Sequence, residues 1–381
     1  MKKNLFLIFI SVFVTLLSIY ISIFIKTSIE KNHQSEYLFK SYQSLGFHKK
    51  YSNILNHLRN SNLNWDFDGN HQNFLYSIIG DFDQSKKNVL LQGDSWIEQI
   101  NLENKSLKNI IEFSKNNNFG IINAGITSFS PTLMKLQYEI LKKDFNIQPD
   151  IVVAYIDQTD IGDEICRYKD KRYFNSKNKL IGVNSEKFSR SNYDYSKIYR
   201  LSEINLRKQK KFIKNINFTN FYIEWKIKRA FVKIGNILSS GFKNKEEKRC
   251  YFGEIQKYLK NNLNNSDKQY FENRLSDYLE TILNDTKVEK ILIVTFPHRN
   301  NLFHEDHEEH YKVNVSNLVD NQLKKMNSSK IKHINFYQLL KDNPKFSFKI
   351  YREGDPASHL NEAPHNEIFT NEILKKLKNF N

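Results

Sequence analysis

Cysteine is nearly absent from this chain of 381 residues, which contains two, Cys166 and Cys250. Two cysteines do not make the disulfide scaffold of a small secreted domain, and whether they pair is open from the sequence. The chain also lacks a Walker loop, a dinucleotide-binding glycine motif and a zinc-finger spacing. We therefore expect neither a cofactor nor a bound metal.

Glycine and proline are scarce too, at 12 and 6 residues, and 42 acidic residues face 58 lysines and arginines. The scarcity accompanies abundant lysine, asparagine and isoleucine, a bias that carries little functional weight. The basic excess gives a formal net charge of +16, typical of proteins that bind polyanions. Hydrophobic residues make up 39% of the chain, which argues against global disorder, and the length suffices for one large core or two modest ones.

One long apolar run occurs, over the 21 residues Leu5–Ile25. As a helix it would span roughly 31 Å, the thickness of a bilayer core. Lys2 and Lys3 before it favour a cytoplasmic N-terminus. A cleaved signal peptide is the alternative, but the run is long and Ile25-Lys26 offers no small-residue cleavage site. We expect an uncleaved single-pass anchor, with the rest of the chain in the periplasm or at the cell surface. An anionic membrane or an acidic polysaccharide is then a better counterpart for the positive charge than nucleic acid.

From residue 87 the pattern alternates between short apolar runs and amphipathic stretches, which predicts a parallel sheet covered by helices on both faces. The predicted strands are Val89–Gln92, Gly120–Asn123, Ile151–Ile156, Ile291–Phe296 and Ile334–Tyr337. The predicted helices are 97–116, Pro131–Phe145, Tyr270–Leu283 and Glu367–Leu377.

The alternation is interrupted, which suggests five segments. Residues 1–26 are the anchor and 27–86 a stalk that becomes helical and packs onto the main domain. The core then comprises 87–165 and 286–381, separated by an insertion over 166–285. Within the insertion, Arg207–Lys233 is rich in lysine and arginine with aromatics between them. It predicts a basic amphipathic helix on a membrane or over a cleft, or a solvated helix packed through its aromatics.

The strongest chemical signal is Gly93-Asp94-Ser95, directly after the first predicted strand. A serine at a strand-to-helix turn lies at the carboxyl edge of the sheet, where open α/β folds bind ligands. It also lies near the free N–H groups of a helix N-terminus, which favour developing negative charge. An ordinary turn with a serine cap is the alternative.

Polar residues follow other strands as well. Asn123-Ala-Gly125 follows the second strand and Asp157-Gln158-Thr159-Asp160 the third, while Asp355 and His359 precede the last helix. A serine, a histidine, an aspartate and fixed donors that converge on one sheet edge make a hydrolytic site.

These four blocks, in this order, resemble the SGNH (GDSL-like) hydrolases over residues 87–165 and 286–381. The resemblance implies a flavodoxin-like three-layer α/β/α sandwich and hydrolysis or transfer of ester-linked acyl groups. It implies Ser95 as nucleophile, His359 as base and Asp355 as its partner. It also places Gly125, Gln158, Asp157, Asp160 and Asn361 at the oxyanion hole or the substrate.

Two features depart from the family pattern. The third block is usually Gly-x-Asn-Asp, whereas here Gln158 would have to replace the asparagine as oxyanion donor. The last block is usually Asp-x-x-His, whereas three residues separate Asp355 from His359. The first departure puts the oxyanion hole in question, and the second the geometry of the pair.

The remaining histidines carry weaker signals. His304, His307 and His310 recur every three residues, as metal ligands on one helical face would, but they lie among acids in what reads as a solvated loop. His298 follows a strand and is predicted either to line the cleft or to be structural. His365 is predicted to be a surface or capping residue.

The sequence thus predicts a membrane-anchored serine esterase or O-acyltransferase acting on acetyl or other acyl groups of cell-surface glycans. Its expected partners are the membrane, a carbohydrate and a membrane acyl-transfer protein. The alternative is a non-catalytic glycan- or partner-binding protein on a degenerate SGNH scaffold. A nucleic-acid-binding protein explains the charge alone.

Overall fold

The computed structural model describes residues 14–15, 17–18, 20, 54–55, 75–79, 85–101, 103–183, 258–261, 263–304, 306–341, 348–355 and 357–380. The chain divides into two compact units, one of Met1–Lys50 with Lys187–Glu247 and one of Tyr51–Glu186 with Lys248–Asn381. The sheet and the candidate site belong to the second unit.

Of the first unit, the described residues between 14 and 20 are helical. No helix in the described ranges has the length and apolar character needed to cross a membrane. Most of the predicted anchor, Leu5–Ile25, and all of the predicted basic helix, Arg207–Lys233, lie outside those ranges.

The main sheet of the second unit has six strands in the order β1-β3-β2-β4-β7-β8. They are β1 (Ser77–Ile79), β2 (Lys87–Gln92), β3 (Phe119–Asn123), β4 (Ile151–Ile156), β7 (Lys290–Thr295) and β8 (Ile331–Asn335). The five strands from β3 to β8 are parallel, while β1 pairs antiparallel with β3. Taken in chain order, the parallel strands have the spatial order 2-1-3-4-5, as in flavodoxin-like doubly wound sheets. The chain runs from β2 outward to β3 and then crosses back to β4, so the point where the strand order reverses lies between β2 and β4, beside the strand that leads into Ser95.

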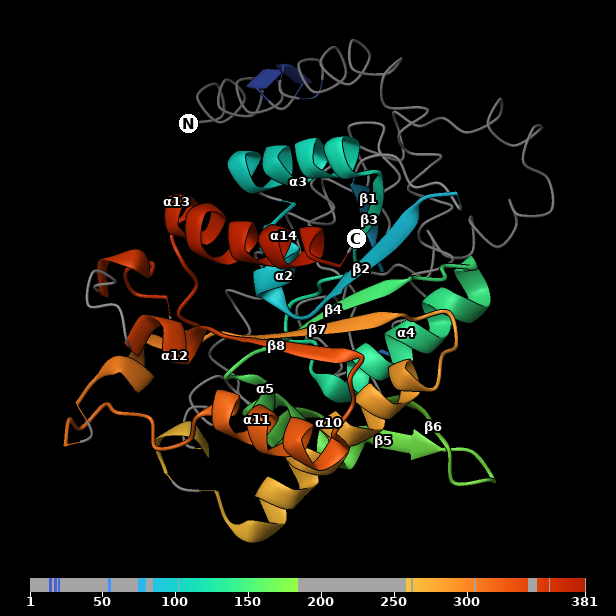
Figure 1. Ribbon diagram of the computed structural model, residues 1–381. Coiled ribbons are helices and arrows are strands. Elements are labelled where there is room, and N and C mark those ends of the chain that lie inside the picture. The colour runs from blue at the N-terminus through green and yellow to red at the C-terminus, as the bar shows by residue number, and fades with distance from the viewer. Residues whose placement is uncertain are drawn as a thin grey trace, which may run out of the picture. The chain divides into compact units, whose positions relative to one another are not determined.

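Helices cover both faces of this sheet (Figure 1). The helical elements of the described residues in this unit are α2 (Ser95–Gln99), α3 (Asn104–Asn117), α4 (Pro131–Phe145), α5 (Asp160–Gly162), η1 (Asp163–Tyr168), η2 (Lys169–Lys171), α10 (Asn265–Leu283), η4 (Arg299–Leu302), α11 (Val315–Met326), α12 (Phe336–Lys341), η5 (Phe348–Ile350), α13 (Glu362–Pro364), η6 (His365–Thr370) and α14 (Asn371–Lys378).

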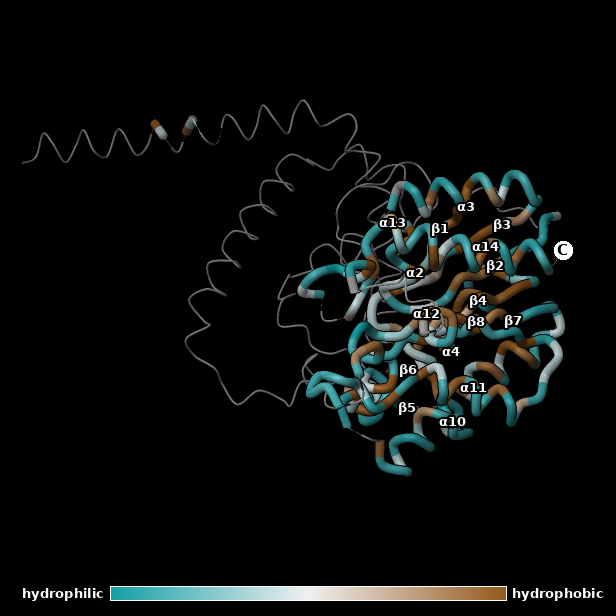
Figure 2. Tube along the Cα trace, turned by 60° about the vertical axis from the view of Figure 1, so that its left-hand side comes forward, coloured by the Kyte–Doolittle hydropathy of each residue, from teal (hydrophilic) through white to brown (hydrophobic). Residues whose placement is uncertain are grey.

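Each face of the sheet has its own core. On one face Leu90, Val152 and Ile293 pack with residues of α4, α10 and α11. On the other face Leu91, Val153 and Leu292 pack with residues of α2, α3 and α14. Figure 2 shows the hydrophobic strands between helices whose outer surfaces are hydrophilic. The predicted three-layer arrangement is therefore present, and consecutive apolar residues occur because both faces of the central strands are covered.

Several predicted elements are confirmed. The bounds of α4 and β4 match the prediction, and β2, β3 and β7 match it to within two residues. The helix α10 starts five residues before the predicted Tyr270, at Asn265, where the Asn264 side chain accepts a hydrogen bond from Asp267 N. The predicted C-terminal helix Glu367–Leu377 is part of a longer helical run, α13-η6-α14.

The single helix predicted over 97–116 is wrong, because the structure has α2 and α3 with a break between them. At the break, Ile97 O accepts the Asn123 side-chain amide at 2.7 Å. Asn101 N–H then donates to Glu98 O at 3.1 Å, three residues back in the chain instead of the four of an α-helix. A polar side chain from β3 thus competes with the helix for a carbonyl and helps to end it.

The edges of the sheet also differ from the prediction. The described part of the predicted stalk includes a strand, β1, so the sheet is not purely parallel. A strand of three residues is too short for a periodic signal. The last strand is β8 rather than Ile334–Tyr337, since Phe336 begins α12 and is buried against Phe296 from there.

The described part of the predicted helical insertion, 166–285, differs from the prediction as well. It contains a two-stranded sheet of β5 (Arg172–Phe174) and β6 (Leu180–Val183). It also contains α10, which packs in the core against α4, so the core extends into the predicted insertion. Cys166 is disulfide-bonded, and the other cysteine of the sequence, Cys250, lies outside the described residues.

Candidate active site

Ser95 is the first residue of α2, just past the carboxyl end of β2. Asp94 caps this helix, with its Oδ1 accepting a hydrogen bond from Trp96 N at 3.0 Å. Trp96 and Ile97 are buried in the core, so α2 is held in place by packing. Ser95 itself is only partly buried. A capped helix with a buried face thus presents the serine at an accessible edge of the sheet.

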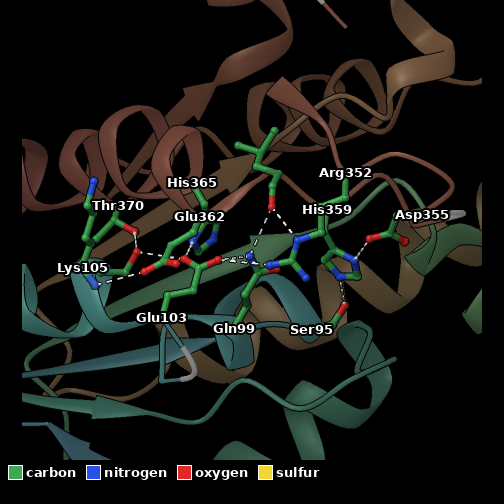
Figure 3. Close-up of polar contacts among 12 residues, drawn as sticks. Ser95, Gln99, Glu103, Lys105, Arg352, Asp355, His359, Glu362, His365 and Thr370 are labelled. Atoms are coloured by element: carbon green, nitrogen blue, oxygen red, sulfur yellow. Dashed lines mark hydrogen bonds and ion pairs between the residues drawn. The ribbon is translucent and has the colours of Figure 1, made fainter. Parts of the chain in front are cut away.

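Ser95, His359 and Asp355 form a continuous hydrogen-bonded chain, which Figure 3 shows. Ser95 Oγ lies 2.7 Å from His359 Nε2, and His359 Nδ1 lies 2.6 Å from Asp355 Oδ2. The side chains of His359 and Asp355 are 16% and 18% exposed, so both are mostly buried but still in contact with solvent. The structure therefore brings together three residues, of which Ser95 and His359 are 264 positions apart in the chain.

The extra residue between Asp355 and His359 is absorbed by a turn. Ser358 has a left-handed backbone with φ of 58°, and its N–H donates to Asp355 O at 3.1 Å. Tyr351 and Leu360 form an antiparallel bridge that closes the loop at its base. The longer spacing therefore still places Asp355 Oδ2 against the imidazole of His359.

The charge on Asp355 is stabilised by this arrangement. Partial burial acts to raise its pKa, but the hydrogen bond and charge of His359 outweigh burial, helped by the Ala357 N–H. The result is a pKa of about 2. Asp355 is thus ionised at neutral pH and accepts a hydrogen bond from His359 Nδ1–H, which leaves Nε2 to accept a proton from Ser95.

Gly125 does not have the role that the sequence suggested. Its N–H donates to Asn123 Oδ1 at 2.8 Å instead of standing free for an oxyanion. A Cβ at this position would lie 2.4 Å from Glu98 N and 2.6 Å from the carbonyl carbon of Ile97. Gly125 is therefore required for the close approach of this loop to the backbone of α2.

Gln158 is also committed elsewhere. The side chain is fully buried, with Nε2 donating to Val313 O at 2.7 Å and Oε1 accepting from Val315 N at 2.9 Å. Both ends of the amide thus hold the segment that leads into α11. These contacts do not support the expectation that Gln158 donates to the oxyanion, which stays a prediction.

Asn361 is a structural residue as well. Its Nδ2 donates to Lys349 O at 3.1 Å and Tyr351 O at 3.2 Å, and its N–H donates to Ile350 O at 2.9 Å. These bonds join the segment that enters the Asp355–His359 loop, 349–351, to the residue that follows the loop, Asn361. Asn361 is exposed as well, and its predicted contact with substrate stays a prediction.

Asp157 and Asp160 belong to a cluster of buried acids beneath the serine, together with Asp94 and Asp163. Asp157 Oδ2 accepts hydrogen bonds from the N–H and the hydroxyl of Thr159. Asp160 Oδ2 accepts from Asp157 N at 3.0 Å. Burial is the main cause that raises the pKa of Asp94, Asp157 and Asp160, and repulsion by neighbouring acids adds to it for Asp94 and Asp160. This cluster lowers stability when it is fully ionised.

We expect Asp160→Asn to stabilise the fold at neutral pH by roughly 1–2 kcal/mol. The new amide oxygen can still accept from Asp157 N, while one buried charge is removed. Because the folded-state pKa is raised above the unfolded value of 3.8, the wild-type fold binds extra protons as the pH falls, so this group's contribution to stability rises on acidification. Asp355 acts oppositely, since its contribution is complete above 3.8 and is lost as the pH falls through about 2.

Urea unfolding of both proteins between neutral pH and ~4 tests this linkage. The gain from Asp160→Asn should be largest at neutral pH and shrink toward acid. A variant that is less stable than the wild type at neutral pH would contradict the assignment.

Two residues beside the triad, Glu103 and Arg352, were not predicted from the sequence to belong to the site. They form a polar cluster with His365 in Figure 3, in which Glu103 and His365 are buried and Arg352 is partly exposed, and His365 Nδ1 lies 2.6 Å from Glu103 Oε2. His365 is fully buried rather than at the surface, which corrects the prediction. The spacing of Gln99, Glu103 and Ser106 would put them on one face of the predicted helix 97–116, which is a weak signal, whereas in the structure they belong to α2, to the cap of α3 and to α3. No local feature of the sequence links them to Arg352.

The other histidines have structural contacts. His298 Nδ1 accepts from Asn300 N at 3.1 Å, and its ring stacks on Tyr311. The ring of His307 stacks on Phe303. In the described part of the chain, no group of three or more His, Cys, Asp or Glu residues could hold a metal ion.

A second hydroxyl–imidazole–carboxylate chain runs through Thr295, His333 and Asp320. Thr295 Oγ1 lies 2.9 Å from His333 Nε2, and Asp320 Oδ1 lies 2.6 Å from His333 Nδ1. Ser316 Oγ adds a bond to Thr295 Oγ1 at 2.9 Å. Both hydroxyl residues are fully buried, so no substrate can reach them. Exposure of the hydroxyl is what distinguishes the Ser95 chain from this one.

Comparison with known proteins leaves the site to be judged on its own geometry. No family model and no curated protein matches the chain. Among solved structures, a variant of the acetylxylan esterase Axe2 from Geobacillus stearothermophilus is similar, with 11% identity, a TM-score of 0.36, and coverage of 76% of this chain and 94% of its own. An alpha/beta hydrolase, LAE5, from the metagenome of Lake Arreo, Spain, has 10% identity, a TM-score of 0.35, and coverage of 79% and 98%. TM-scores this low carry no argument about function.

Proposed function

We propose that this chain is a serine esterase or O-acyltransferase. The observation that supports it is the chain from Asp355 through His359 to a partly exposed Ser95, at the carboxyl edge of a parallel sheet. Open α/β sheets bind ligands at this edge, near the strand where the chain reverses direction. An exposed hydroxyl within hydrogen-bond reach of an oriented imidazole is the arrangement of an activated nucleophile.

The chemistry follows from the three contacts. Ser95 Oγ attacks the ester carbonyl while His359 Nε2 takes its proton, and Asp355 holds the resulting imidazolium. The imidazolium then protonates the departing alcohol, which leaves an acyl group on Ser95. Water or a sugar hydroxyl, deprotonated by His359, attacks this acyl-enzyme and releases the serine. Hydrolysis and transfer differ only in this acceptor.

The oxyanion must be held by donors other than Gly125 N–H and Gln158. In the first turn of α2, Trp96 N–H is bonded to Asp94 Oδ1 and Glu98 N–H to Asp94 O. The N–H of Ser95 is the first of the helix and has no acceptor within it. We therefore assign oxyanion stabilisation to the Ser95 N–H, on the residue that carries the nucleophile.

The proposed substrate class is an ester-linked acyl group, acetyl in size by the family resemblance, on a cell-surface glycan. The order of Gly93-Asp94-Ser95, Asn123-Ala-Gly125 and the Asp355/His359 pair along a 2-1-3-4-5 sheet supports an SGNH-type enzyme. The run Leu5–Ile25 supports a membrane anchor with the enzyme outside the cytoplasm. An N-terminus sequenced near residue 27 in protein purified from membranes would exclude a retained anchor.

A second candidate is a non-catalytic glycan-binding protein on the same scaffold. The commitment of Gly125 N–H and the Gln158 amide to other residues favours it, because two expected oxyanion donors are lost. A non-catalytic protein, however, has no role for the hydrogen-bonded chain Ser95–His359–Asp355. The two candidates differ in whether Ser95 is nucleophilic.

Labelling of the full chain with a fluorophosphonate probe tests the proposal. We expect covalent modification of Ser95 and none of Ser316, which belongs to the buried second chain and serves as an internal control. Ser95→Ala should abolish labelling. Folded wild-type protein that is not labelled, but binds acylated glycans, would establish the second candidate instead.

A further inference from the structure

The triad is connected to a second polar cluster through the backbone of His359 and Leu360. This cluster, the Glu103 cluster, consists of Gln99, Glu103, Ser106, Arg352 and His365. Figure 3 shows Gln99, Glu103, Arg352 and His365 beside Ser95 and His359. Neither Arg352 nor Glu103 contacts Ser95, so the proposed chemistry does not use them directly.

Arg352 binds two consecutive carbonyl groups of the backbone, those of His359 and Leu360. Its N–H donates to His359 O at 2.8 Å, and its side-chain Nε donates to Leu360 O at 2.9 Å. The same guanidinium donates through Nη2 to Glu103 Oε1 at 3.2 Å. One planar side chain thus ties the residue after the histidine to a fixed carboxylate on the neighbouring helix.

Glu103 holds the guanidinium of Arg352 in place. It is 5% exposed and accepts hydrogen bonds from Gln99, Ser106 and Arg352, with His365 Nδ1 at 2.6 Å. Burial acts to raise its pKa, but the hydrogen bond and charge of His365, with the bonds from Gln99 and Ser106, outweigh burial and lower it. A buried carboxylate with this many partners has little freedom to move.

The loop between the two anchored ends needs such support. Glu353 and Gly354 are exposed, and Ser358 adopts a left-handed conformation that serine visits at some cost. His359 must nevertheless keep two hydrogen bonds, to Ser95 and to Asp355, at the same time. A displacement of about 1 Å is enough to reduce catalysis by about a hundredfold.

We propose that Arg352, anchored by Glu103, is a positioning residue that holds His359 in register with Ser95. The inference rests on the proposed function, since it concerns the base of that reaction. Arg352 is 42% exposed in its side chain and contributes hydrogen bonds rather than core packing. A lysine at this position is a point charge without the planar fork and can reach one of the two acceptors at a time.

Kinetics of the full chain with p-nitrophenyl acetate test this role. Arg352→Ala should lower kcat by about a hundredfold with KM changed less than about threefold. Arg352→Lys should recover part of kcat, and Glu103→Gln should lower kcat in the same direction as Arg352→Ala. The downfield proton resonance of the His359 Nδ1–H bond should broaden or disappear in Arg352→Ala.

Asp285→Asn is the matched control. Asp285 is also a buried carboxylate, 6% exposed, whose partners are Tyr138, Lys142 and the Lys287 N–H. Removing its charge should lower stability while leaving kcat and the downfield resonance near wild type. A loss of kcat in Asp285→Asn equal to that in Glu103→Gln would show that general destabilisation explains both, and would overturn the inference.

A double-mutant cycle separates positioning from folding. In a His359→Ala background, Arg352→Ala should have little further effect, because the residue through which Arg352 acts is gone. Full additivity, or wild-type kcat in Arg352→Ala, would refute the positioning role. Failure of the proposed function has a different outcome, since the wild type itself would then show neither turnover nor labelling of Ser95.

Discussion

Replacing Ser95 by alanine should remove nearly all ester hydrolysis by this chain, and replacing His359 by alanine should do the same. Losses on the order of 10⁴–10⁶ in kcat are typical when the nucleophile or base of such a unit is removed. The double variant should be scarcely worse than either single one, because the hydroxyl at 2.7 Å from Nε2 works only with the imidazole present. Asp355→Ala should be milder, since the nucleophile and the base both remain and only the orientation of the ring and the support of its positive charge are lost.

His333→Ala is the control for the loss of an imidazole. His333 also bridges a hydroxyl and a carboxylate, but the hydroxyl of Thr295 is fully buried. This variant should lower the free energy of unfolding and keep the rate of ester hydrolysis. Substantial activity in His359→Ala, or clearly additive losses with Ser95→Ala, would show that the base lies elsewhere.

Gly125→Ala should be the most damaging conservative change outside the triad. The added Cβ would lie 2.4 Å from Glu98 N and 2.6 Å from the carbonyl carbon of Ile97, both in the backbone of α2. Backbone cannot rotate aside as a flexible side chain can, so α2 and the Ser95 at its start must shift. We expect about a hundredfold loss in kcat/KM and a loss of about 3 kcal/mol in the free energy of unfolding.

This variant also distinguishes two roles for the glycine. Alanine retains the backbone N–H, so a glycine that served only as a hydrogen-bond donor would tolerate the change. Gly354→Ala is the matched control, because no atom of the described residues lies within 4 Å of its added methyl group and its cost comes from a left-handed φ of 69°. That cost is about 1 kcal/mol. Kinetics and urea unfolding measure both effects, and a wild-type rate in Gly125→Ala would refute the close-packing role.

The sequence by itself determined the central sheet and the order of the site residues. β4 and α4 were predicted with their observed bounds, because strands covered on both faces are continuous apolar runs and Pro131 marks a helix start. Ser95 could be placed at the sheet edge because a glycine and a capping aspartate follow β2 directly. These features depend on neighbours in the chain, which a sequence displays.

Only the tertiary structure decided what the polar side chains around the serine do. Gln158 binds the backbone 155 residues away, at Val313, and Asn361 binds that of Lys349 and Tyr351. Glu103 and Arg352 meet across 249 residues. A buried polar group must find a hydrogen-bond partner, and the fold determines which partner is within reach. The residue types therefore showed that chemistry was possible, while the packing of distant segments decided that His359 meets Ser95 and that Gln158 binds the backbone before α11.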